Sequence, residues 1–492
     1  MPNLTRSTLL LWLLAATLLL APLLRSGNTP LALLLLELLA LALLVLALWD
    51  PRFWLQLPRL QQLFLGGIVT LPVLYLIPLP ALLASMLPGR ETYELATSLA
   101  LKGESGGWGG ISLVPGETGA GFLKLLLPVA VFLAAIQLRH KRQQQLVFLL
   151  LGMAALQAFL GLVQYGAGIG GPAMIATDHA NAGNAAGTYT SRNNFAGFLY
   201  LLLMPCLALY MATLGRHRPR GPSPIRQRLL FWSSLKGHQA FLFGALALLL
   251  ILGVVFSRSR AGIGLTMLGV GLVSVLLARR IGGGKTSVSL IGSLLSVAVG
   301  LAVAIGLAPV WQRFAVSDPV SDGRFTIFTG ALDAIRNSFP LGLGPGVFQE
   351  SFFPWQHLSQ ASYLINQAHN GFLEWVYDGG LPALLLIGLG LFLFLQRWPA
   401  LWRAGHWGDF RYLQVGTGLG LGLMLLHELV DYNLFVPANM AAFALLAAVF
   451  LQEYEEPVVQ RSRSTTRREA PDPRAVSLPP PNPAATNPFM NS

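Results

Sequence analysis

Four arginines and one histidine stand out in this chain as residues that could carry chemistry. They are Arg192, Arg258, Arg260, Arg324 and His369. A guanidinium group is planar and can bind two oxygens of one phosphate at once. An imidazole can accept a proton near neutral pH and so act as a general base. Together, these residue types would suit a site that holds an anionic phosphate group beside a base.

Polar residues follow the histidine directly. Asn370 is its neighbour, and Glu374 lies about one helical turn further along the chain. Glu374 could therefore orient the imidazole ring, which favours a functional role for His369. A lone histidine is more often structural, so both interpretations stay open on these residues alone.

The composition indicates a membrane protein, whose helices must position these residues. Of its 492 residues, 54% are hydrophobic and only 11% are charged, whereas a soluble domain carries roughly 25% charged residues. The apolar residues form blocks such as 31–49 and 240–256, which match the thickness of a bilayer. The single Cys206 lies in an apolar block and excludes a disulfide framework. The sequence thus predicts an all-α polytopic membrane protein.

The apolar blocks predict about twelve transmembrane helices. They lie near residues 8–24, 31–49, 63–83, 122–138, 146–165, 195–214, 240–256, 261–278, 287–307, 380–396, 412–430 and 434–452. The first block has no clear small-residue cleavage site, so we interpret it as a retained helix. The longest connector, residues 308–379 between spans 9 and 10, carries Arg324 and His369. We expect this loop to be partly helical and to close over a site at the helix ends.

The distribution of charge predicts the orientation of these helices. Alternate connectors contain clusters of lysine and arginine, which stay on the cytoplasmic side, and the opposite connectors hold most of the acidic residues. Both termini are therefore predicted to be cytoplasmic, and the loop 308–379 to lie outside. The net charge of +12 arises from the connectors, so we expect no binding of nucleic acid.

The four arginines run against this distribution, because they lie near the outer ends of helices. Such a residue is usually paired or functional. A set of four would form an anion clamp that faces outward. Each arginine could instead extend to lipid headgroups or pair with an acid such as Asp178 or Asp322. The structural explanation is as good as the functional one for a single arginine, and weaker for the set.

A second histidine opens the segment His427-Glu428-Leu429-Val430-Asp431. Asp431 stands where a zinc-binding helix needs its second histidine, so the metalloprotease motif fails. His427 and Asp431 lie four residues apart on one helix face, and we interpret them as a structural or supporting pair. The alternating glycines of Pro340–Gly346 predict a tight turn that lets the backbone approach a ligand or a helix end.

These motifs together resemble the O-antigen ligase and polymerase superfamily, whose members move lipid-linked glycans at the outer face of bacterial inner membranes. The resemblance runs from about Ser191 to Met440. The motifs that carry it are, in order, Ser191–Gly197, Ser257–Gly262, Gly323-Arg324, Pro340–Phe348, Ala368–Glu374 and His427–Asn439. One departure is Asn194, where many relatives have an aromatic residue or a histidine.

The resemblance implies an inverting and metal-independent transfer from a glycan donor on undecaprenyl pyrophosphate. His369 would deprotonate the acceptor hydroxyl, while Arg192 and Arg260 hold the departing pyrophosphate. No metal and no cofactor is implied. Fixed guanidinium groups in a low-dielectric groove would stabilise the charge that builds up as pyrophosphate leaves. Further candidates for substrate binding are Arg258, Arg324, Asn193, Asn370 and Glu374.

The resemblance also divides the chain. Residues 1–190 would form N-terminal membrane helices, residues 191–452 the catalytic membrane region, and residues 453–492 a disordered cytoplasmic tail. The implied location is the bacterial inner membrane, with the active site on the periplasmic side. The implied partners are the lipid-linked donor, a glycan acceptor and membrane lipids.

Three functions are compatible with these features. A polymerase of O-antigen or exopolysaccharide joins one lipid-linked repeat to another, whereas a ligase passes the glycan to lipid A–core. The general form of the Ser191–Gly197 motif and the long final loop favour a polymerase. A lipid or glycan transporter without catalysis is the alternative of another class. It should place ionisable residues near the middle of the membrane, where Glu37 is the clear acidic example.

Overall fold

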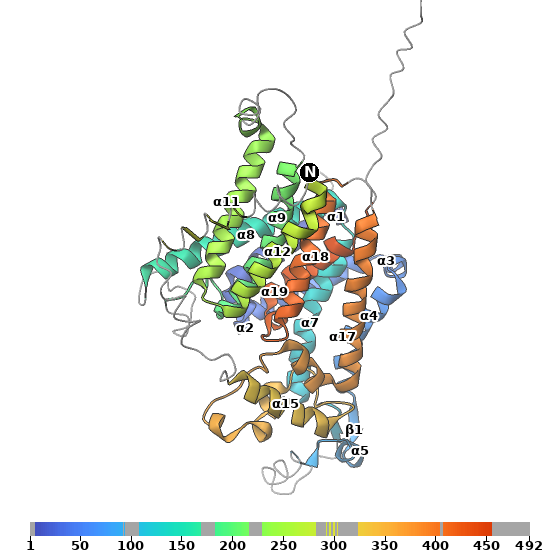
Figure 1. The fold of residues 1–492 in the computed structure, drawn as a ribbon. Coiled ribbons are helices and arrows are strands. Elements are labelled where there is room, and N and C mark those ends of the chain that lie inside the picture. Colours follow the sequence, from blue (N-terminus) through green and yellow to red (C-terminus); the bar gives the residue numbers. More distant parts are fainter. Residues whose placement is uncertain are drawn as a thin grey trace, which may run out of the picture. The chain divides into compact units, whose positions relative to one another are not determined.

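The computed structural model describes most of the chain up to Tyr454, within one compact unit (Figure 1). The described residues are 5–91, 93, 108–168, 183–215, 229–281, 292, 295–296, 299–300, 303, 323–403 and 407–454. The tail beyond Tyr454 and nearly all of the predicted span 287–307 lie outside the described residues. So do Asp178 and Asp322, the acids considered as arginine partners.

Eight helices of the described chain are long and apolar enough to cross a membrane. They are α1 (Arg6–Leu23), α2 (Pro30–Ala47), α7 (Pro115–Ile136), α8 (His140–Ala167), α9 (Arg192–Gly215), α11 (Leu235–Phe256), α12 (Arg260–Ile281) and α17 (Gly371–Arg403). Three further helices pack among them, namely α4 (Arg59–Tyr75), α18 (Asp409–His427) and α19 (Pro437–Leu451). The prediction of a polytopic all-α membrane protein is confirmed at this level.

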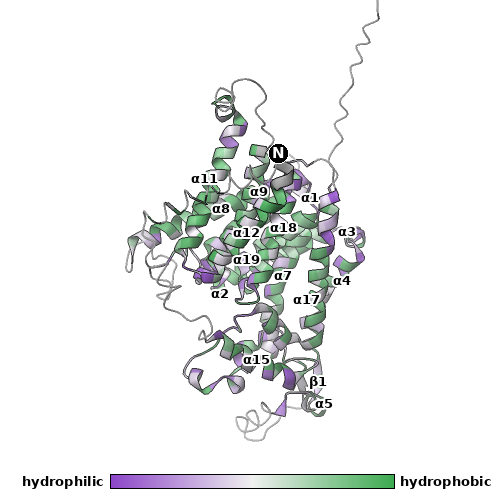
Figure 2. Cartoon of the chain, in the orientation of Figure 1, coloured by the Kyte–Doolittle hydropathy of each residue, from purple (hydrophilic) through white to green (hydrophobic). Residues whose placement is uncertain are grey.

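Several short helices and two short strands connect the long helices. They are η1 (Arg25–Gly27), α3 (Pro51–Gln56), β1 (Pro78–Pro80), α5 (Ala81–Ser85), β2 (Trp108–Gly110), α15 (Arg324–Ser338), α16 (Phe348–Ser351), η3 (Phe353–Trp355), η4 (Leu358–Gln360) and η5 (Asn433–Phe435). Strands β1 and β2 pair antiparallel. Figure 2 shows that the most hydrophobic residues gather on the long helices, while polar residues are concentrated near α15 and at the helix ends.

One predicted boundary was wrong, and one helical segment was not predicted. The predicted span 63–83 ends as a helix at Tyr75, because the prolines of Pro78–Pro80 lack the backbone N–H that a helix needs and adopt a strand instead. The predicted span 380–396 starts at the kink of α17 at Gly380, whereas the helical segment from Gly371 to this kink and the continuation to Arg403 were not predicted. The polar residues of the first turns of α17 are accommodated inside the protein, where they are buried, so hydropathy could not reveal this part of the helix.

Helix α9 forms the centre of the bundle, and nearly all of its side chains are buried. It contacts α18, α11, α12 and α8. The contact with α18 is close because small residues face it. A methyl group at Gly416 would lie 2.6 Å from Cα of Pro205, and one at Gly420 would collide with the carbonyl oxygen of Leu201. Small residues are the usual means of close helix packing in membranes.

Basic residues gather at one end of the bundle, which we call the basic face. Arg6 donates from Nε to the carbonyl oxygen of Leu46 (2.7 Å) and from Nη2 to Oε1 of Gln137 (2.6 Å). Arg397 donates to the carbonyl oxygen of Phe450 (3.1 Å), and Arg411 to that of Tyr454 (2.7 Å). These residues cap the helix ends there. The opposite end, where α9, α12, α17 and α19 begin, is the site face.

Helix α17 is kinked near the site face. Gly380 has φ 54° and ψ −142°, which interrupts the helix. The glycine-rich segment 340–346 binds this kink through three backbone hydrogen bonds: Leu343 N to Tyr377 O (3.2 Å), Gly344 N to Asp378 O (2.8 Å) and Leu381 N to Pro340 O (2.7 Å). The predicted approach of the glycine run to a helix end is thus observed as an approach to a helix kink.

Replacing Gly342 with alanine is expected to destabilise the protein by about 1–3 kcal/mol. Gly342 has φ 75°, and an added Cβ would lie 2.6–2.8 Å from backbone atoms of Tyr377, Asp378 and Gly380. Thermal unfolding of the solubilised protein measures the effect. Gly388→Ala on α17 is the control, because no atom lies within 4 Å of its added Cβ. Equal unfolding temperatures for the two variants would contradict the proposed packing.

Candidate active site

His369 lies immediately before α17 in a constrained loop. Its φ is 53°, a left-handed conformation that is uncommon for residues other than glycine. Asn370 caps α17, because its Oδ1 accepts a hydrogen bond from Leu373 N (3.0 Å). Gly371 N donates to the carbonyl oxygens of Glu428 (2.8 Å) and Asp431 (3.0 Å). The histidine loop is therefore tied to the segment that follows α18.

Glu374 supports the same loop from inside the protein. The residue is 2% exposed, and its Oε2 accepts a hydrogen bond from Ala368 N (2.7 Å). The sequence suggested that Glu374 could orient the imidazole ring. In the structure this carboxylate holds the backbone that leads into His369, so it constrains the position from which the ring extends.

Tyr432 packs against the imidazole ring of His369. The two ring centroids lie 5.1 Å apart in an edge-to-face arrangement, at an interplanar angle of 65°. Tyr432 N in turn donates to Oδ1 of Asp431 (2.9 Å). His369 is thus held next to the segment 431–432 by both its backbone and its ring.

Asp431 joins residues from three parts of the chain. Its Oδ2 accepts a hydrogen bond from Nδ2 of Asn193 (2.7 Å) and lies 3.6 Å from Nη2 of Arg324. The Nε2 atom of His427 lies 4.0 Å from the same oxygen. The Asp431 side chain is only 1% exposed. One buried carboxylate therefore connects the start of α9, the start of α15 and the end of α18 beside His369.

Arg324 is placed over this carboxylate by two contacts. Its Nη1 donates to the carbonyl oxygen of Val430, and its Nη2 forms the ion pair with Asp431. A quarter of the side chain (25%) stays exposed. The guanidinium group is therefore held in one orientation while part of its surface can still meet a ligand.

His427 is buried behind Asp431. Its Nδ1 lies 2.9 Å from the hydroxyl of Tyr200 on α9, and the residue is completely buried. The prediction that His427 and Asp431 share one helix face is wrong, because α18 ends at His427 and Asp431 lies in the turn beyond it, although their side chains still approach to 4.0 Å. The position of His427 inside the bundle fits its interpretation as a supporting residue.

Asparagines fasten α19 and η5 to the start of α9. Asn439 donates from Nδ2 to the carbonyl oxygen of Asn194 (3.1 Å) and to Oδ1 of Asn433 (3.3 Å). Gly197 is needed here, because a methyl group would collide with Oδ1 of Asn433. Asn194, the position that departs from the family pattern, is 1% exposed. Its backbone carbonyl holds this junction in place.

Arg192 and Arg260 are the first residues of α9 and α12. The first turns of these two helices are closely packed, since a methyl group at Gly262 would lie 2.7 Å from Cβ of Ala196. Both arginines are half-buried. The two helix starts that carry these arginines, with the positive ends of their helix dipoles, thus lie close together on the site face. Asn193 links this place to Asp431.

Arg258 contacts the segment 183–184. Its φ is 56°, and its Nη1 donates to Oδ1 of Asn184 (3.2 Å) and to the carbonyl oxygen of Gly183 (3.4 Å). It therefore holds the segment 183–184 against the hairpin between α11 and α12. The structure brings His369, Arg324, Asn193 and Asp431 together, and it gives Arg258 a contact of its own.

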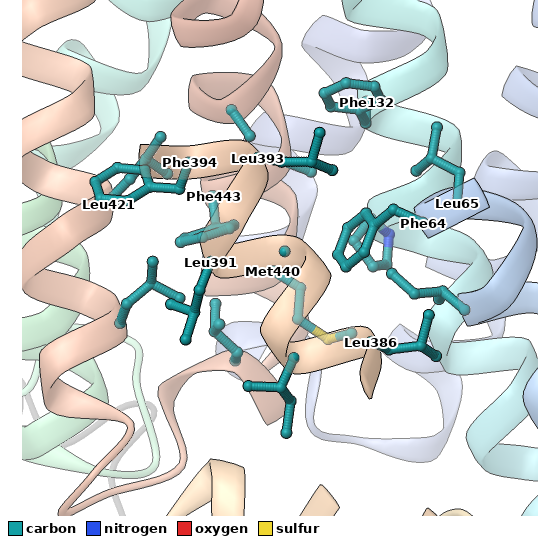
Figure 3. Close-up of a pocket in the computed structure, with 18 of the residues that line it drawn as sticks. Phe64, Leu65, Phe132, Leu386, Leu391, Leu393, Phe394, Leu421, Met440 and Phe443 are labelled. Atoms are coloured by element: carbon teal, nitrogen blue, oxygen red, sulfur yellow. The ribbon is translucent and has the colours of Figure 1, made fainter. Parts of the chain in front are cut away.

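An apolar cavity of about 270 Å³ opens beside the histidine loop. Gly371 and Glu428 line it near His369, and Phe450 and Leu451 line it toward the basic face. Figure 3 shows side chains of α4, α7, α17 and α19 around it, including Phe64, Phe132, Leu391 and Phe443. Such a cavity can hold a hydrocarbon chain.

Three residues of this region had not been assigned a role from the sequence. Tyr432 and Glu428 stand within motifs that had been weighed only as a zinc helix or as part of the family pattern. Glu428 is 2% exposed, and its Oε1 accepts a hydrogen bond from Leu434 N (2.9 Å). Lys124 had a clear signal, since it is a cation inside an apolar block.

Comparison with known proteins gives one family. Residues 245–388 match the family model described as O-antigen ligase. A comparison with curated proteins gives no significant match. The matched range includes four of the candidate site arginines and histidines, namely Arg258, Arg260, Arg324 and His369.

Proposed function

We propose that this chain is a glycosyltransferase. The premise is that it belongs to the O-antigen ligase and polymerase superfamily, whose family model matches residues 245–388. Its donor would be a glycan on undecaprenyl pyrophosphate, and its acceptor another glycan. Residues 191–452 would form the catalytic membrane region. The observation that carries the proposal is the position of His369, which packs against Tyr432 beside the Arg324–Asp431 ion pair and lies two residues before Gly371, a lining residue of the apolar cavity.

The geometry supports a donor that is both anionic and lipid-linked. The apolar cavity suits a hydrocarbon chain, and a lipid so bound would present its headgroup at the site face. There the arginines at the starts of α9 and α12 would meet the pyrophosphate. A guanidinium group can bind two phosphate oxygens at once, and this electrostatic interaction is stronger where water is excluded.

The proposed reaction is an inverting displacement. His369 removes the proton of the acceptor hydroxyl, whose oxygen attacks the anomeric carbon of the donor sugar from the face opposite the pyrophosphate. The bond between the anomeric carbon and the pyrophosphate oxygen breaks, and Arg192 and Arg260 hold the leaving group. General-base assistance contributes about 10²–10⁴-fold to the rate. Asn193 and Asp431 would keep the arginine-bearing helix start and the histidine loop in register.

We further propose a location in the bacterial inner membrane, with the basic face in the cytoplasm. The clustered arginines of that face support this orientation through the positive-inside bias. Both termini would then be cytoplasmic, and the site face would be periplasmic. The acceptor is proposed to be a second lipid-linked repeat, so that the enzyme is a polymerase of O-antigen or exopolysaccharide. The description of the matching family favours a ligase acting on lipid A–core as the alternative.

The test is to incubate purified protein with a synthetic undecaprenyl-pyrophosphate glycan, alone and with a lipid A–core acceptor. We expect growing glycan chains from the donor alone, measured by gel electrophoresis and mass spectrometry. A product that forms only with the core acceptor would identify a ligase. A parallel reaction with a chelator is expected to run at an unchanged rate, because the proposed mechanism uses no metal. No product under either condition, from protein that unfolds cooperatively, would overturn the proposal.

A further inference from the structure

A second cavity lies beside the apolar one and differs from it in chemistry. It has a volume of about 290 Å³, close to the lower end of the range for small-ligand sites. It shares walls with the apolar cavity, including Leu125, Trp375 and Met440. Unlike the apolar cavity, it is also lined by polar side chains from α7, α16 and α17. We call it the polar chamber.

Two buried oxygens of the polar chamber lack hydrogen-bond partners among the described residues. They are Oδ1 of Asp378 and Oε1 of Gln367. Asp378 is only 5% exposed, and its other oxygen accepts a hydrogen bond from Gly346 N (2.7 Å). A buried polar atom without a partner costs free energy, so such atoms are rarely left unmatched. The unmatched atoms here are acceptors, and a ligand that donates hydrogen bonds would satisfy them.

The remaining charges narrow the class of ligand. Carboxyl groups of Glu117, Glu350, Glu374 and Asp378 line the chamber, and Lys124 is the cation among its described lining residues. A phosphate group would find few donors here. Sugar hydroxyls fit both types of group, because each can donate to a carboxylate and accept from an ammonium. Trp375 adds an aromatic face on which the apolar side of a sugar ring can pack.

The chamber adjoins the histidine loop. Gln367, which lies two residues before His369, lines the chamber. Glu374 also lines it, and its carboxylate accepts the hydrogen bond from Ala368 N (2.7 Å). The helix starts with Arg192 and Arg260 belong to other elements, α9 and α12. The geometry points to the polar chamber as the site that binds the acceptor saccharide. This inference rests on the proposed function. The sugar held there presents its reactive hydroxyl to His369, while the donor pyrophosphate lies at the arginines.

The experiment measures sugar binding separately from transfer. The full chain is placed in lipid nanodiscs, and the probe is the lipid-free glycan released by mild acid from undecaprenyl-linked intermediates of the producing cells. Saturation-transfer NMR then gives the dissociation constant. Asp378→Asn keeps the shape of the side chain, and its amide oxygen can still accept the hydrogen bond from Gly346 N. The amide NH2 group then replaces the carboxylate oxygen that has no partner. This substitution is expected to weaken binding about tenfold, and Gln367→Ala to weaken it to a smaller extent.

Two controls separate the possible outcomes. Asp333→Asn, an exposed carboxylate on α15, should bind the glycan like the unsubstituted chain. His369→Ala should also bind it, because Asp378 and Gln367 are unchanged, although its rate of transfer falls. If no glycan binds the unsubstituted chain, or if Asp378→Asn and Gln367→Ala both bind it with full affinity, the acceptor site is refuted while a measured transfer activity would still stand. Chamber-dependent binding without any transfer would instead refute the proposed function alone.

Discussion

Replacing His369 with alanine will reduce glycan transfer by about 10²–10⁴-fold, because the acceptor hydroxyl loses its general base. The measurement is the rate of transfer from a synthetic lipid-linked donor at saturating acceptor. The imidazole lies next to the anchored segment 431–432 and not in the hydrophobic core. Its removal should therefore leave insertion into the membrane and thermal unfolding nearly unchanged.

A second variant separates the loss of the base from a change of the backbone. His369 adopts φ 53°, and asparagine tolerates this conformation better than most residues. His369→Asn should therefore be as inactive as His369→Ala while keeping the loop in place. His357→Ala is the matched control, since His357 is exposed on the same long connector. Full activity of either His369 variant would eliminate the proposed base.

Replacing Arg260 with lysine will lower transfer nearly as far as replacing it with alanine, by about 10²–10³-fold. Lysine keeps the positive charge but provides a single ammonium group in place of the planar fork that binds two phosphate oxygens. Arg260 begins α12, whose first turn packs against α9 at Gly262 and Ala196, so the fork is presented from a fixed helix start. The rate of transfer at saturating donor measures the effect.

The control for this substitution is Arg336→Lys. Arg336 is exposed on α15, where it pairs with Asp333 at 2.9 Å, and the replacement should not alter transfer. If Arg260→Lys retains the full rate, the residue acts as a simple point charge. In that case, two-pronged binding of the leaving group at this position would be wrong.

The apolar blocks and the two arginine-bearing helix starts could be predicted from the sequence because they depend on local properties. A bilayer-length run of apolar residues predicts a helix wherever it occurs. Arg192 and Arg260 stand at the edges of such runs, so their place at helix starts followed directly. The clustering of basic residues at one end of the bundle could likewise be predicted, from the distribution of lysine and arginine among the connectors. Arg397 and Arg411 form their contacts at this end.

The central place of Asp431 could not be predicted in the same way. Its importance arises from contacts with Asn193 and Arg324, which are far away in the chain. No periodicity links such residues, and the local spacing relates Asp431 only to His427. The first turns of α17 were missed for a related reason. Glu374 and Asp378 resemble loop residues by hydropathy, yet both are buried inside the protein.

The kink at Gly380 has a consequence for how base and acceptor are aligned. The helical segment between His369 and the kink carries Glu374, Trp375 and Asp378, so it contains the anchor of the histidine loop and one wall of the polar chamber. Both therefore belong to one short helical segment, which is separated from the long membrane helix by a kink that the glycine-rich segment holds. The hydrogen bonds of Gly371 N to Glu428 and Asp431, and that of Asn193 to Asp431, connect this segment to the start of α9. The relative position of base, acceptor and Arg192 is thus set by contacts on the site face and does not depend on the course of the long helix beyond the kink.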